Sequence, residues 1–266
     1  MFLINPYILQ TSGGSYSYLL DDYPGAYVAY STRKLSSTYI GSCIRIRRSS
    51  DNAEQDIDFV GNDLDTASIS SFCGAGVGYV VKWYDQSGNA EDKSNSTAAN
   101  QPIIYNNGMI TRNGKPYISA SSSQWLQLTS AQNVSGSFTF FITYEKDASG
   151  NQAILLDGSN TYAWLDYGLN QYHSTNFTVP ISSVYNVNTL YLNNTISLPA
   201  SSSIYRNNTL IGTAGTKSGS SYLNRLPGNA SRSATIHFSE FIFYPSDKTS
   251  DSPDINNNIN NYFSIY

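Results

Sequence analysis

Short runs of β-branched and aromatic residues, separated by Gly, Asn, Asp, Ser and Pro, recur along most of this 266-residue chain. Clear examples are "AYVAYS" (26–31), "CIRIRRS" (43–49), "GYVVKWY" (78–84), "SFTFFITYEK" (137–146) and "ATIHFSEFIFY" (234–244). The strict alternation in "CIRIR" predicts a strand with one buried face. Many short strands at a spacing of about 8–12 residues are typical of a sandwich or jelly roll. The pattern therefore predicts an all-β protein.

Two segments carry helical signals, and one carries a tight-turn signal. Apolar spacing behind an N-cap at Asp63 or Asp65 predicts a short helix near 64–73. The polar segment 253–262 has its isoleucines on one face and predicts a C-terminal helix. The Asn-Asn dipeptide at 207–208 predicts a two-residue hairpin, because Asn tolerates positive φ.

The composition excludes several classes of partner. Only 13% of the residues are charged and the net charge is −4, so we expect no nucleic-acid partner. No apolar run approaches the length of about 18 residues that spans a bilayer, and the N-terminus lacks a basic region and cleavage site, so we expect neither a membrane partner nor a signal peptide. Cys43 and Cys73 match no zinc spacing; two unpaired thiols are the favoured interpretation and a disulfide is the alternative.

The first residues predict an arm that is separate from the main domain. We expect an N-terminal anchoring arm over 1–22 and one β-sandwich domain over 23–266. The arm carries the anchoring candidates Phe2, Leu3, Ile4, Pro6 and Tyr7. The polar stretch "QTSGGSYS" follows them as a flexible joint. The apolar segment is interpreted either as a strand on the edge of the domain or as a peptide that docks on a partner protein.

The motif "DQSGN" ends an apolar run and carries Asp85, Ser87, Gly88 and Asn89. Its oxygen-bearing residues have the spacing of the first ligands in a calcium loop, but the Gly and Glu that an EF-hand loop needs further on are absent. Asp85 can instead accept hydrogen bonds from the amides of Ser87 and Gly88, with Gly88 at positive φ. The motif therefore predicts a structural turn rather than a metal site.

The acidic stretch 51–65 offers many oxygen atoms for calcium. Such a run is more often a solvated loop that leads to a helix N-terminus, where anions are favoured. We therefore expect no cofactor and no metal, with calcium in this loop as the alternative.

The motifs "GAYVAYSTRKL", "CIRIRRSSDNAEQDI", "YVVKWYDQSGNAEDKSNSTAANQP", "NGKPYI" and "SEFIFYPSDKTS…INNYFSIY" occur in this order. With them the chain resembles the concanavalin A-like lectin/glucanase superfamily, specifically the arabinofuranosidase B-type jelly-roll domain. Similar domains occur as non-enzymatic modules in virion proteins of tailed bacteriophages. Over residues 23–266 the resemblance implies a concanavalin A-like jelly-roll β-sandwich whose concave face can bind sugars. With the helical signals above, the expected fold has one short internal helix and a short C-terminal helix.

The resemblance also implies where hydrolytic carboxylates would stand. The Glu nucleophile would lie in "WLDYGLNQY", where Asp166 is retained but Gly168 takes the place of the Glu. The acid would lie in 224–238, which contains no Asp or Glu, and the vicinal cysteine pair of those hydrolases is missing. Because a glycosidase needs two carboxylates, we expect that the chain is not an enzyme.

The same segment, "TYAWLDYGLNQYH", is rich in groups that bind sugars. Aromatic faces stack on sugar rings, while amides and carboxylates orient them. The carbohydrate-binding candidates are Tyr162, Trp164, Asp166 and Asn170. Burial of the aromatic residues in the core is an equally weighted interpretation.

These expectations combine into a predicted role as a non-enzymatic bacteriophage virion protein. A capsid decoration or head-fibre subunit is preferred and a tail fibre is next, assembled in the host cytoplasm. Residues 1–22 would anchor it to other virion proteins, and we expect a homo-oligomer that can bind glycans. The alternatives are a secreted carbohydrate-binding module and an arabinofuranosidase-like glycoside hydrolase.

Overall fold

The structure, a computed structural model, describes most of the chain. The described residues are 17–121, 123–134, 137–146, 153–156, 163–166, 186–193, 202–214, 221–226 and 235–266.

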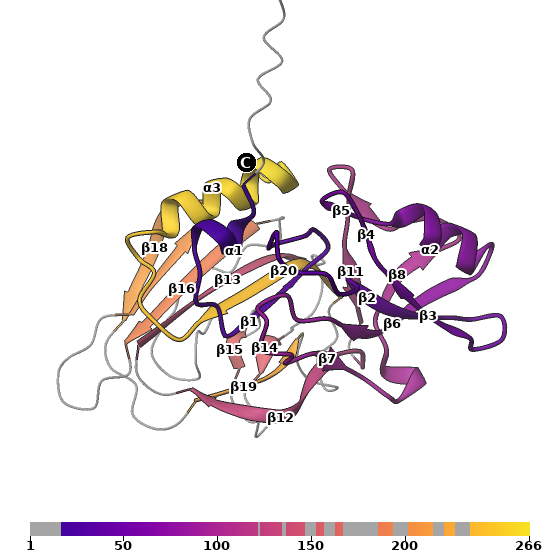
Figure 1. The fold of residues 1–266 in the computed structure, drawn as a ribbon. Coiled ribbons are helices and arrows are strands. Elements are labelled where there is room, and N and C mark those ends of the chain that lie inside the picture. The colour runs from indigo at the N-terminus through magenta and orange to yellow at the C-terminus, as the bar shows by residue number, and fades with distance from the viewer. Residues whose placement is uncertain are drawn as a thin grey trace, which may run out of the picture.

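The strands are ordered in two layers, which we call the front and back sheets (Figure 1). The front sheet contains, in spatial order, β15 (Ala163–Asp166), β14 (Ala153–Leu156), β19 (Ser221–Leu226), β12 (Leu126–Val134), β7 (Lys93–Ser94), β6 (Val77–Trp83), β2 (Ile44–Arg48) and β3 (Glu54–Ile57). The back sheet contains β11 (Ile118–Ala120), β20 (Ile236–Tyr244), β13 (Ser137–Lys146), β16 (Asn186–Asn193), β17 (Ser202–Arg206) and β18 (Thr209–Ala214), with β1 (Val28–Ser31) also paired to β20.

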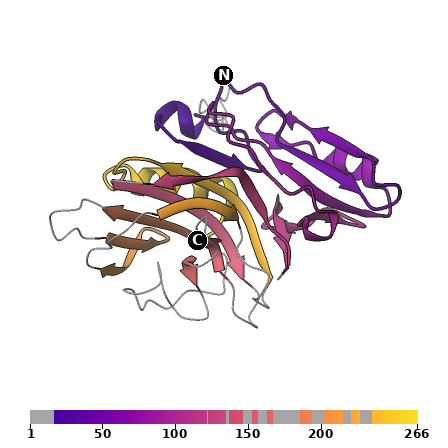
Figure 2. The ribbon, with the colours of Figure 1, turned by 90° about the horizontal axis from the view of Figure 1, so that it is seen from below.

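Pairing between early and late parts of the chain closes the fold. β8 (Ile103–Asn106) is hydrogen-bonded to both β6 and β11 and so connects the two sheets. Figure 2 shows the early strands, indigo to magenta, on one side of the molecule and the late strands, orange to yellow, on the other. The seam between them is formed by β1 and β11 pairing with β20, and by β7 pairing with β12, all antiparallel.

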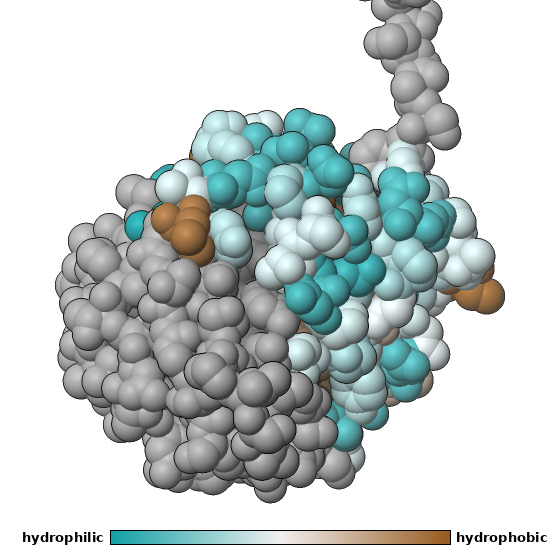
Figure 3. Space-filling view, turned by 90° about the vertical axis from the view of Figure 1, so that its left-hand side faces the viewer, coloured by the Kyte–Doolittle hydropathy of each residue, from teal (hydrophilic) through white to brown (hydrophobic). Residues whose placement is uncertain are grey.

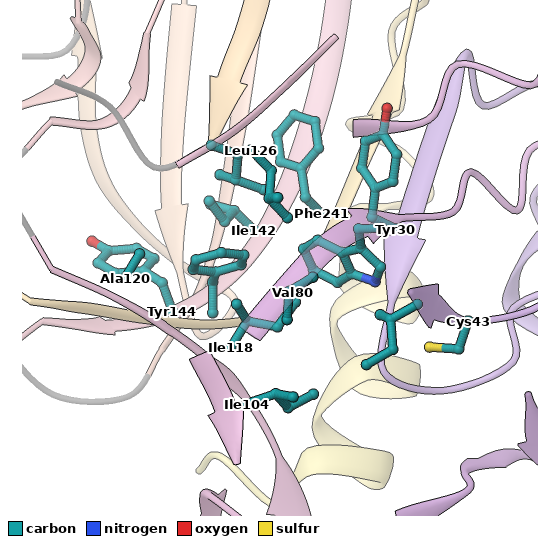
Figure 4. Close-up of a cluster of buried hydrophobic side chains, with 14 of the residues drawn as sticks. Tyr30, Cys43, Val80, Ile104, Ile118, Ala120, Leu126, Ile142, Tyr144 and Phe241 are labelled. Atoms are coloured by element: carbon teal, nitrogen blue, oxygen red, sulfur yellow. The ribbon is translucent and has the colours of Figure 1, made fainter. Parts of the chain in front are cut away.

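The main core lies between the two sheets. Trp83 is fully buried, with its ring 5.5 Å from Phe238 and 5.7 Å from Tyr30. Figure 4 shows Tyr30, Phe241 and Leu126 of β12 in this cluster, where the Tyr30 and Phe241 rings lie 6.4 Å apart. Burial of such large aromatic side chains contributes about 25 cal/mol for each Å² of apolar surface removed from water. In the described part of the chain, nine aromatic side chains are buried in this core.

A second core covers the outer face of the back sheet. Helices α1 (Leu19–Asp22) and α3 (Ser252–Phe263) lie over this face (Figure 1). Ile255 and Ile259 of α3 share a buried cluster with Phe141 and Ile242 of the sheet. The periodicity that predicted a helix near 253–262 thus corresponds to an apolar face packed on the sheet.

Helix α2 (Thr66–Cys73) follows an Asp65 N-cap whose side chain accepts a hydrogen bond of 2.9 Å from the Ser68 amide. Two short hairpins and one helical turn complete the described elements: β4 (Phe59–Val60) with β5 (Asp63–Leu64), β9 (Thr111–Arg112) with β10 (Lys115–Pro116), and the 3-10 turn η1 (Ala98–Asn100). The predicted all-β jelly-roll sandwich with two short helices is confirmed. Helix α1 was not predicted.

Helix α1 belongs to the packed domain although its residues were assigned to the arm. Leu19 is 1% exposed and Leu20 is 9% exposed, and both belong to the second core. The Leu20 amide donates to the Leu35 carbonyl at 2.8 Å. The folded part of the chain therefore includes residues that the sequence alone placed outside it.

Both cysteines are buried free thiols. No helix in the described part of the chain combines the length and the apolar character that crossing a membrane requires. On the face in Figure 3, hydrophobic residues in brown form isolated spots among teal and white ones. This face therefore presents a largely hydrophilic surface wherever the structure describes it.

Candidate functional site

The "DQSGN" motif forms a turn directly after β6, and Asp85 is its centre. The carboxylate of Asp85 is almost fully buried and accepts hydrogen bonds from the amides of Ala29 (2.8 Å), Ser87 (2.9 Å) and Glu91 (3.2 Å) and from the Ser87 hydroxyl (2.7 Å). Gly88 has φ 92°, a conformation that favours glycine. The Ser87 bond is the expected Asx turn. The expected bond from the Gly88 amide is not found in the described part of the chain, and the Ala29 and Glu91 amides donate to Asp85 instead.

The neighbouring residues of the motif tie the turn to the segment around β1. Gln86 is 2% exposed; its side chain accepts from the Leu35 amide at 2.8 Å and donates to the Arg33 carbonyl at 2.9 Å. Asn89 donates to the Tyr27 carbonyl at 2.9 Å. We call residues 85–89, together with the backbone groups of 26–35 that they bind, the Asp85 clasp. The oxygen atoms and amide groups of the clasp therefore form hydrogen bonds within the protein.

A surface pocket of about 310 Å³ lies beside the clasp. Its lining comes from the segments 20–26, 36–41 and 86–88, and its rim includes Ile40, whose side chain is 99% exposed. None of the described residues that line it is an Asp or Glu. Because glycoside cleavage needs carboxylates, this described lining lacks the groups of a glycosidase centre.

The outward face of the front sheet carries a different set of side chains. Residues directly opposite each other on paired strands share a face, and Arg225, Gln127, Ser94 and Lys82 are consecutive opposite partners across four strands. All four are half-buried, whereas Lys93 beside Ser94 is fully buried on the inward side. The face thus presents a polar row that crosses the strands.

The two ends of this polar row are held differently. Lys82 forms a salt bridge of 3.3 Å with Asp92. Arg225 donates from Nε to the Gln127 Oε1 at 2.9 Å, and its guanidinium lies 4.6 Å from the centre of the Trp125 ring. An aromatic ring, an amide and a guanidinium are thereby grouped on an accessible sheet face, a combination that suits sugar recognition.

Lys93 is a titratable group in the core that the sequence did not indicate. Its ammonium donates to the Asn224 carbonyl and lies 5.6 Å from the centre of the Tyr30 ring. Burial lowers the pKa of Lys93 to about 7, although the charges of Asp85 and Glu91 act in the opposite direction. A lysine embedded in the polar stretch "AEDKSNS" gives no periodic signal of burial, so only the folded structure identifies it.

The acidic stretch 51–65 contains carboxylates with separate partners. Asp51 pairs with Arg48 at 2.7 Å, Asp56 pairs with Arg45 at 2.6 Å, and Asp65 caps α2. The guanidinium of Arg45 lowers the pKa of Asp56, as the hydrogen bonds from Ser68 do for Asp65. Among the described residues, no three His, Cys, Asp or Glu side chains gather in a group that could hold a metal ion.

The structure describes some of the predicted sugar-binding residues and none of the predicted anchoring residues. Trp164 and Asp166 belong to β15 at the edge of the front sheet, where the Asp166 backbone lies opposite Ala153 of β14. Tyr162 and Asn170 lie outside the described residues. The anchoring residues Phe2, Leu3, Ile4, Pro6 and Tyr7 also lie outside them. The sugar-binding prediction therefore stays a prediction, now placed at the β15 edge of the sheet that carries the polar row.

Comparison with known proteins gives one family and one fold. The model of the family "Alpha-L-arabinofuranosidase B, catalytic" matches residues 21–170, more than half of the chain. A GH54 α-L-arabinofuranosidase soaked with a cyclic sulfate inhibitor is 16% identical, with a TM-score of 0.65. A mutant of a GH54 α-L-arabinofuranosidase soaked with 4-nitrophenyl α-L-arabinofuranoside is 17% identical, also with a TM-score of 0.65. An arabinofuranosidase complexed with arabinofuranosyl-α-1,2-xylobiose is 16% identical, with a TM-score of 0.59.

Each of these alignments covers 91% of this chain and 64% of the solved chain, so the present chain spans less than two thirds of their length. At this identity the solved structures establish the fold. No curated protein sequence matches the chain.

The expectation that the chain is not an enzyme is contradicted, because the matching family model is that of a catalytic domain. That expectation rested on Gly168 and on the lack of acidic residues in 224–238. Both observations depend on aligning single residues with the family. A carboxylate that is missing at one aligned position can be supplied from elsewhere in the chain. By the match over residues 21–170, the chain belongs to the family of alpha-L-arabinofuranosidase B catalytic domains.

Proposed function

We propose that the chain is a glycosidase that removes α-L-arabinofuranosyl groups from a larger glycan. The observation that carries this proposal is the match of the catalytic-domain model over residues 21–170. The jelly-roll sandwich and the accessible aromatic and amide groups on its front sheet support it. That the substrate is a natural glycan is part of this proposal.

We place the reaction at the β15 edge of the front sheet. Glycoside cleavage uses one carboxyl group that protonates the leaving oxygen and a second carboxylate that attacks the sugar or activates water. Asp166 lies in β15, within the matched range, and is the carboxylate that we assign to this site. The mechanism requires a second carboxylate from another segment. Trp164, with Tyr162 and Asn170, would contact the sugar.

Hydrolysis of 4-nitrophenyl α-L-arabinofuranoside tests the proposal directly. We expect the full chain to release 4-nitrophenol and Asp166→Asn to lower kcat/KM by about 100-fold or more, since a positioned acid or base contributes on this scale. Asp247→Asn is the matched control, because among the described residues the Asp247 carboxylate binds Thr249 alone, in a loop beyond β20. A wild-type chain without turnover, or an Asp166→Asn variant as active as wild type, would contradict the assignment.

Sugar binding can be measured separately from turnover. We expect Trp164→Ala to weaken the binding of an arabinofuranosyl oligosaccharide by about tenfold, because stacking on an aromatic face contributes about 1 kcal/mol or more. Titration calorimetry on the Asp166→Asn background prevents hydrolysis from interfering. Unchanged affinity would place Trp164 in the core, the alternative that its sequence context left open.

A second proposal concerns where the domain works. We infer that it is carried on a bacteriophage virion, assembled in the host cytoplasm as a homo-oligomer and attached to other virion proteins through its first residues. The sequence supports this with an apolar segment followed by "QTSGGSYS", and the packed domain begins by α1. Because Leu19 and Leu20 are core residues, the informative truncation removes 1–16 only. The truncated chain should keep its Tm within a few degrees but be lost from particles; particles that retain it, or never contain the full chain, would contradict the inference.

A further inference from the structure

Arg225 is a half-buried cation whose orientation is fixed by neighbouring residues. Its Nε donates to Gln127 at 2.9 Å, and its guanidinium lies against the Trp125 ring at 4.6 Å. Trp125 is itself held by its backbone, since its amide donates to the Asn100 carbonyl at 3.0 Å and its carbonyl accepts from the Asn95 amide side chain at 2.9 Å. The planar fork of Arg225 is therefore pre-oriented, with Nε occupied and the two terminal nitrogens at the other edge.

The terminal nitrogens of Arg225 have no hydrogen-bond partner, and no carboxylate pairs with this guanidinium, among the residues that the structure describes. By contrast, Arg45, Arg48 and Arg112 each pair with a carboxylate on the surface. Burial lowers the pKa of Arg225, as expected for a guanidinium that has lost water without gaining a negative partner. Binding an anion therefore stabilises this partly dehydrated guanidinium more than it would stabilise a fully hydrated guanidinium.

The shape of the surroundings favours a planar anion attached to a sugar. A guanidinium presents two parallel N–H groups that match the two oxygens of a carboxylate. Along the same face lie Gln127 and Ser94, whose strands are about 4.8 Å apart, a spacing at which their polar groups can reach successive hydroxyls of a sugar chain. In the described part of the polar row the other cation, Lys82, is paired with Asp92, so Arg225 is the single unpaired cation there, which fits one carboxylate better than a polyphosphate backbone.

We propose that Arg225, Gln127 and Trp125 form a binding site for the carboxylate of a uronic acid residue. The proposal rests on the proposed function for the statement that the ligand is a glycan, and it adds that this glycan is acidic. The carboxylate would take the two terminal nitrogens of Arg225, while Gln127 holds Nε and Trp125 supports the plane of the fork. The chain would therefore prefer arabinofuranosyl glycans that also carry uronic acids.

The test compares two ligands with the same sugar chain, one with ionised carboxylates and one with methyl-esterified ones. Trigalacturonic acid and its methyl ester are titrated into the full chain by calorimetry at low salt. We expect the acid to bind about tenfold more tightly than the ester, with an affinity that falls as NaCl is added, because hydrogen bonds to charged groups contribute on this scale. Equal affinities for acid and ester, or a preference that salt does not weaken, would overturn the proposal.

Three variants locate the preference. Arg225→Gln should remove it, and Arg225→Lys should retain only part of it, because an ammonium lacks the fork. Arg45→Gln, which removes a front-sheet guanidinium already paired with Asp56, should retain all of it. A circular-dichroism melt of each variant establishes that it is folded. A preference that survives in Arg225→Gln, or equal binding of free acetate at the same concentration, would overturn the site.

The outcomes separate this inference from the proposed function. A wild-type chain that hydrolyses 4-nitrophenyl α-L-arabinofuranoside but does not distinguish acid from ester refutes only the uronate site. A chain that prefers the acid but hydrolyses nothing refutes only the glycosidase proposal.

Discussion

The Asp85 clasp and the site of Arg225, Gln127 and Trp125, which we call the Arg225 face, both hold charged groups at partly or fully buried positions. They use these groups in opposite ways. In the clasp, one carboxylate receives hydrogen bonds from Ala29, Ser87 and Glu91, so its charge is fully engaged by the protein. On the face, the guanidinium of Arg225 has one hydrogen bond and one aromatic contact in the described part of the chain. The contrast separates a charge that holds the fold from one that is available to a ligand.

The difference also explains why the more conspicuous motif is the less functional one. "DQSGN" is conspicuous because its residue types occur in metal and catalytic loops. However, the Asp85 carboxylate is buried and all its hydrogen-bonding capacity is used, so it has no free lone pair directed at a substrate. Arg225 lies in an ordinary strand sequence, "SYLNRL", and only its setting in the fold distinguishes it. Partner saturation is thus a better guide to role than motif.

The largest effect is expected in the clasp. Asp85→Ala should lower the free energy of unfolding by about 3 kcal/mol or more, because several buried or partly buried donors lose a charged acceptor at once. Urea denaturation followed by tryptophan fluorescence measures this change. A loss below about 1 kcal/mol would mean that water replaces the carboxylate, and the clasp would then not be the stabilising element described here.

Lys93 lies between the two regions, and it predicts a pH dependence. The folded state holds the pKa of Lys93 at about 7, below its ordinary value of 10.5, so between these values the unfolded chain binds one more proton than the folded chain. Stability should therefore rise with pH above 7, by about 1.4 kcal/mol per pH unit from this group. Urea denaturation at pH 7, 8 and 9 should show this slope in wild type and its loss in Lys93→Met.

A Lys93→Met variant that keeps the same slope would assign the pH dependence to other groups. The contacts with Asn224 and Tyr30 would then be structural only.

The smallest effect is expected on the Arg225 face. Arg225→Gln should change the free energy of unfolding by no more than about 0.5 kcal/mol, since a half-exposed side chain with one hydrogen bond contributes little. The same denaturation assay, run beside Asp85→Ala, makes the comparison direct. A loss approaching that of Asp85→Ala would make Arg225 a structural residue and remove the contrast between the two regions.

Local chemistry made much of the fold predictable. Asp65 caps α2, and Asn207 and Asn208 adopt φ values of 47° and 63° in the turn between β17 and β18, because these choices depend on neighbours in sequence. The isoleucine spacing placed α3 within one residue at each end. The Asx turn at Asp85 followed from the same kind of short-range reasoning.

What sequence could not supply depends on contacts between distant segments. Arg33 and Glu240 form a fully buried ion pair of 2.8 Å, and neither residue type signals burial on its own. Lys93 meets Asn224 only because β7 and β19 both flank β12 in the sheet. At the candidate site, the sequence predicted sugar binding by the aromatic segment around Trp164, which stays a prediction, whereas the pairing of Arg225 with Gln127 required the register of two strands. The enzyme prediction failed for a related reason, since it relied on single aligned positions.

The pairing of β1 with β20 joins strands that are synthesised at very different times. Ser31 and its partner Glu240 are 209 residues apart, so the first strand leaves the ribosome long before its neighbour exists. At about 5–20 residues per second, that wait lasts on the order of ten seconds or more. Throughout it, the hydrogen-bonding groups of β1 that face β20 form an open edge that other chains can bind. A nascent chain stalled before Ile236 would therefore be a natural client for chaperones, and release of the last strand would end that dependence.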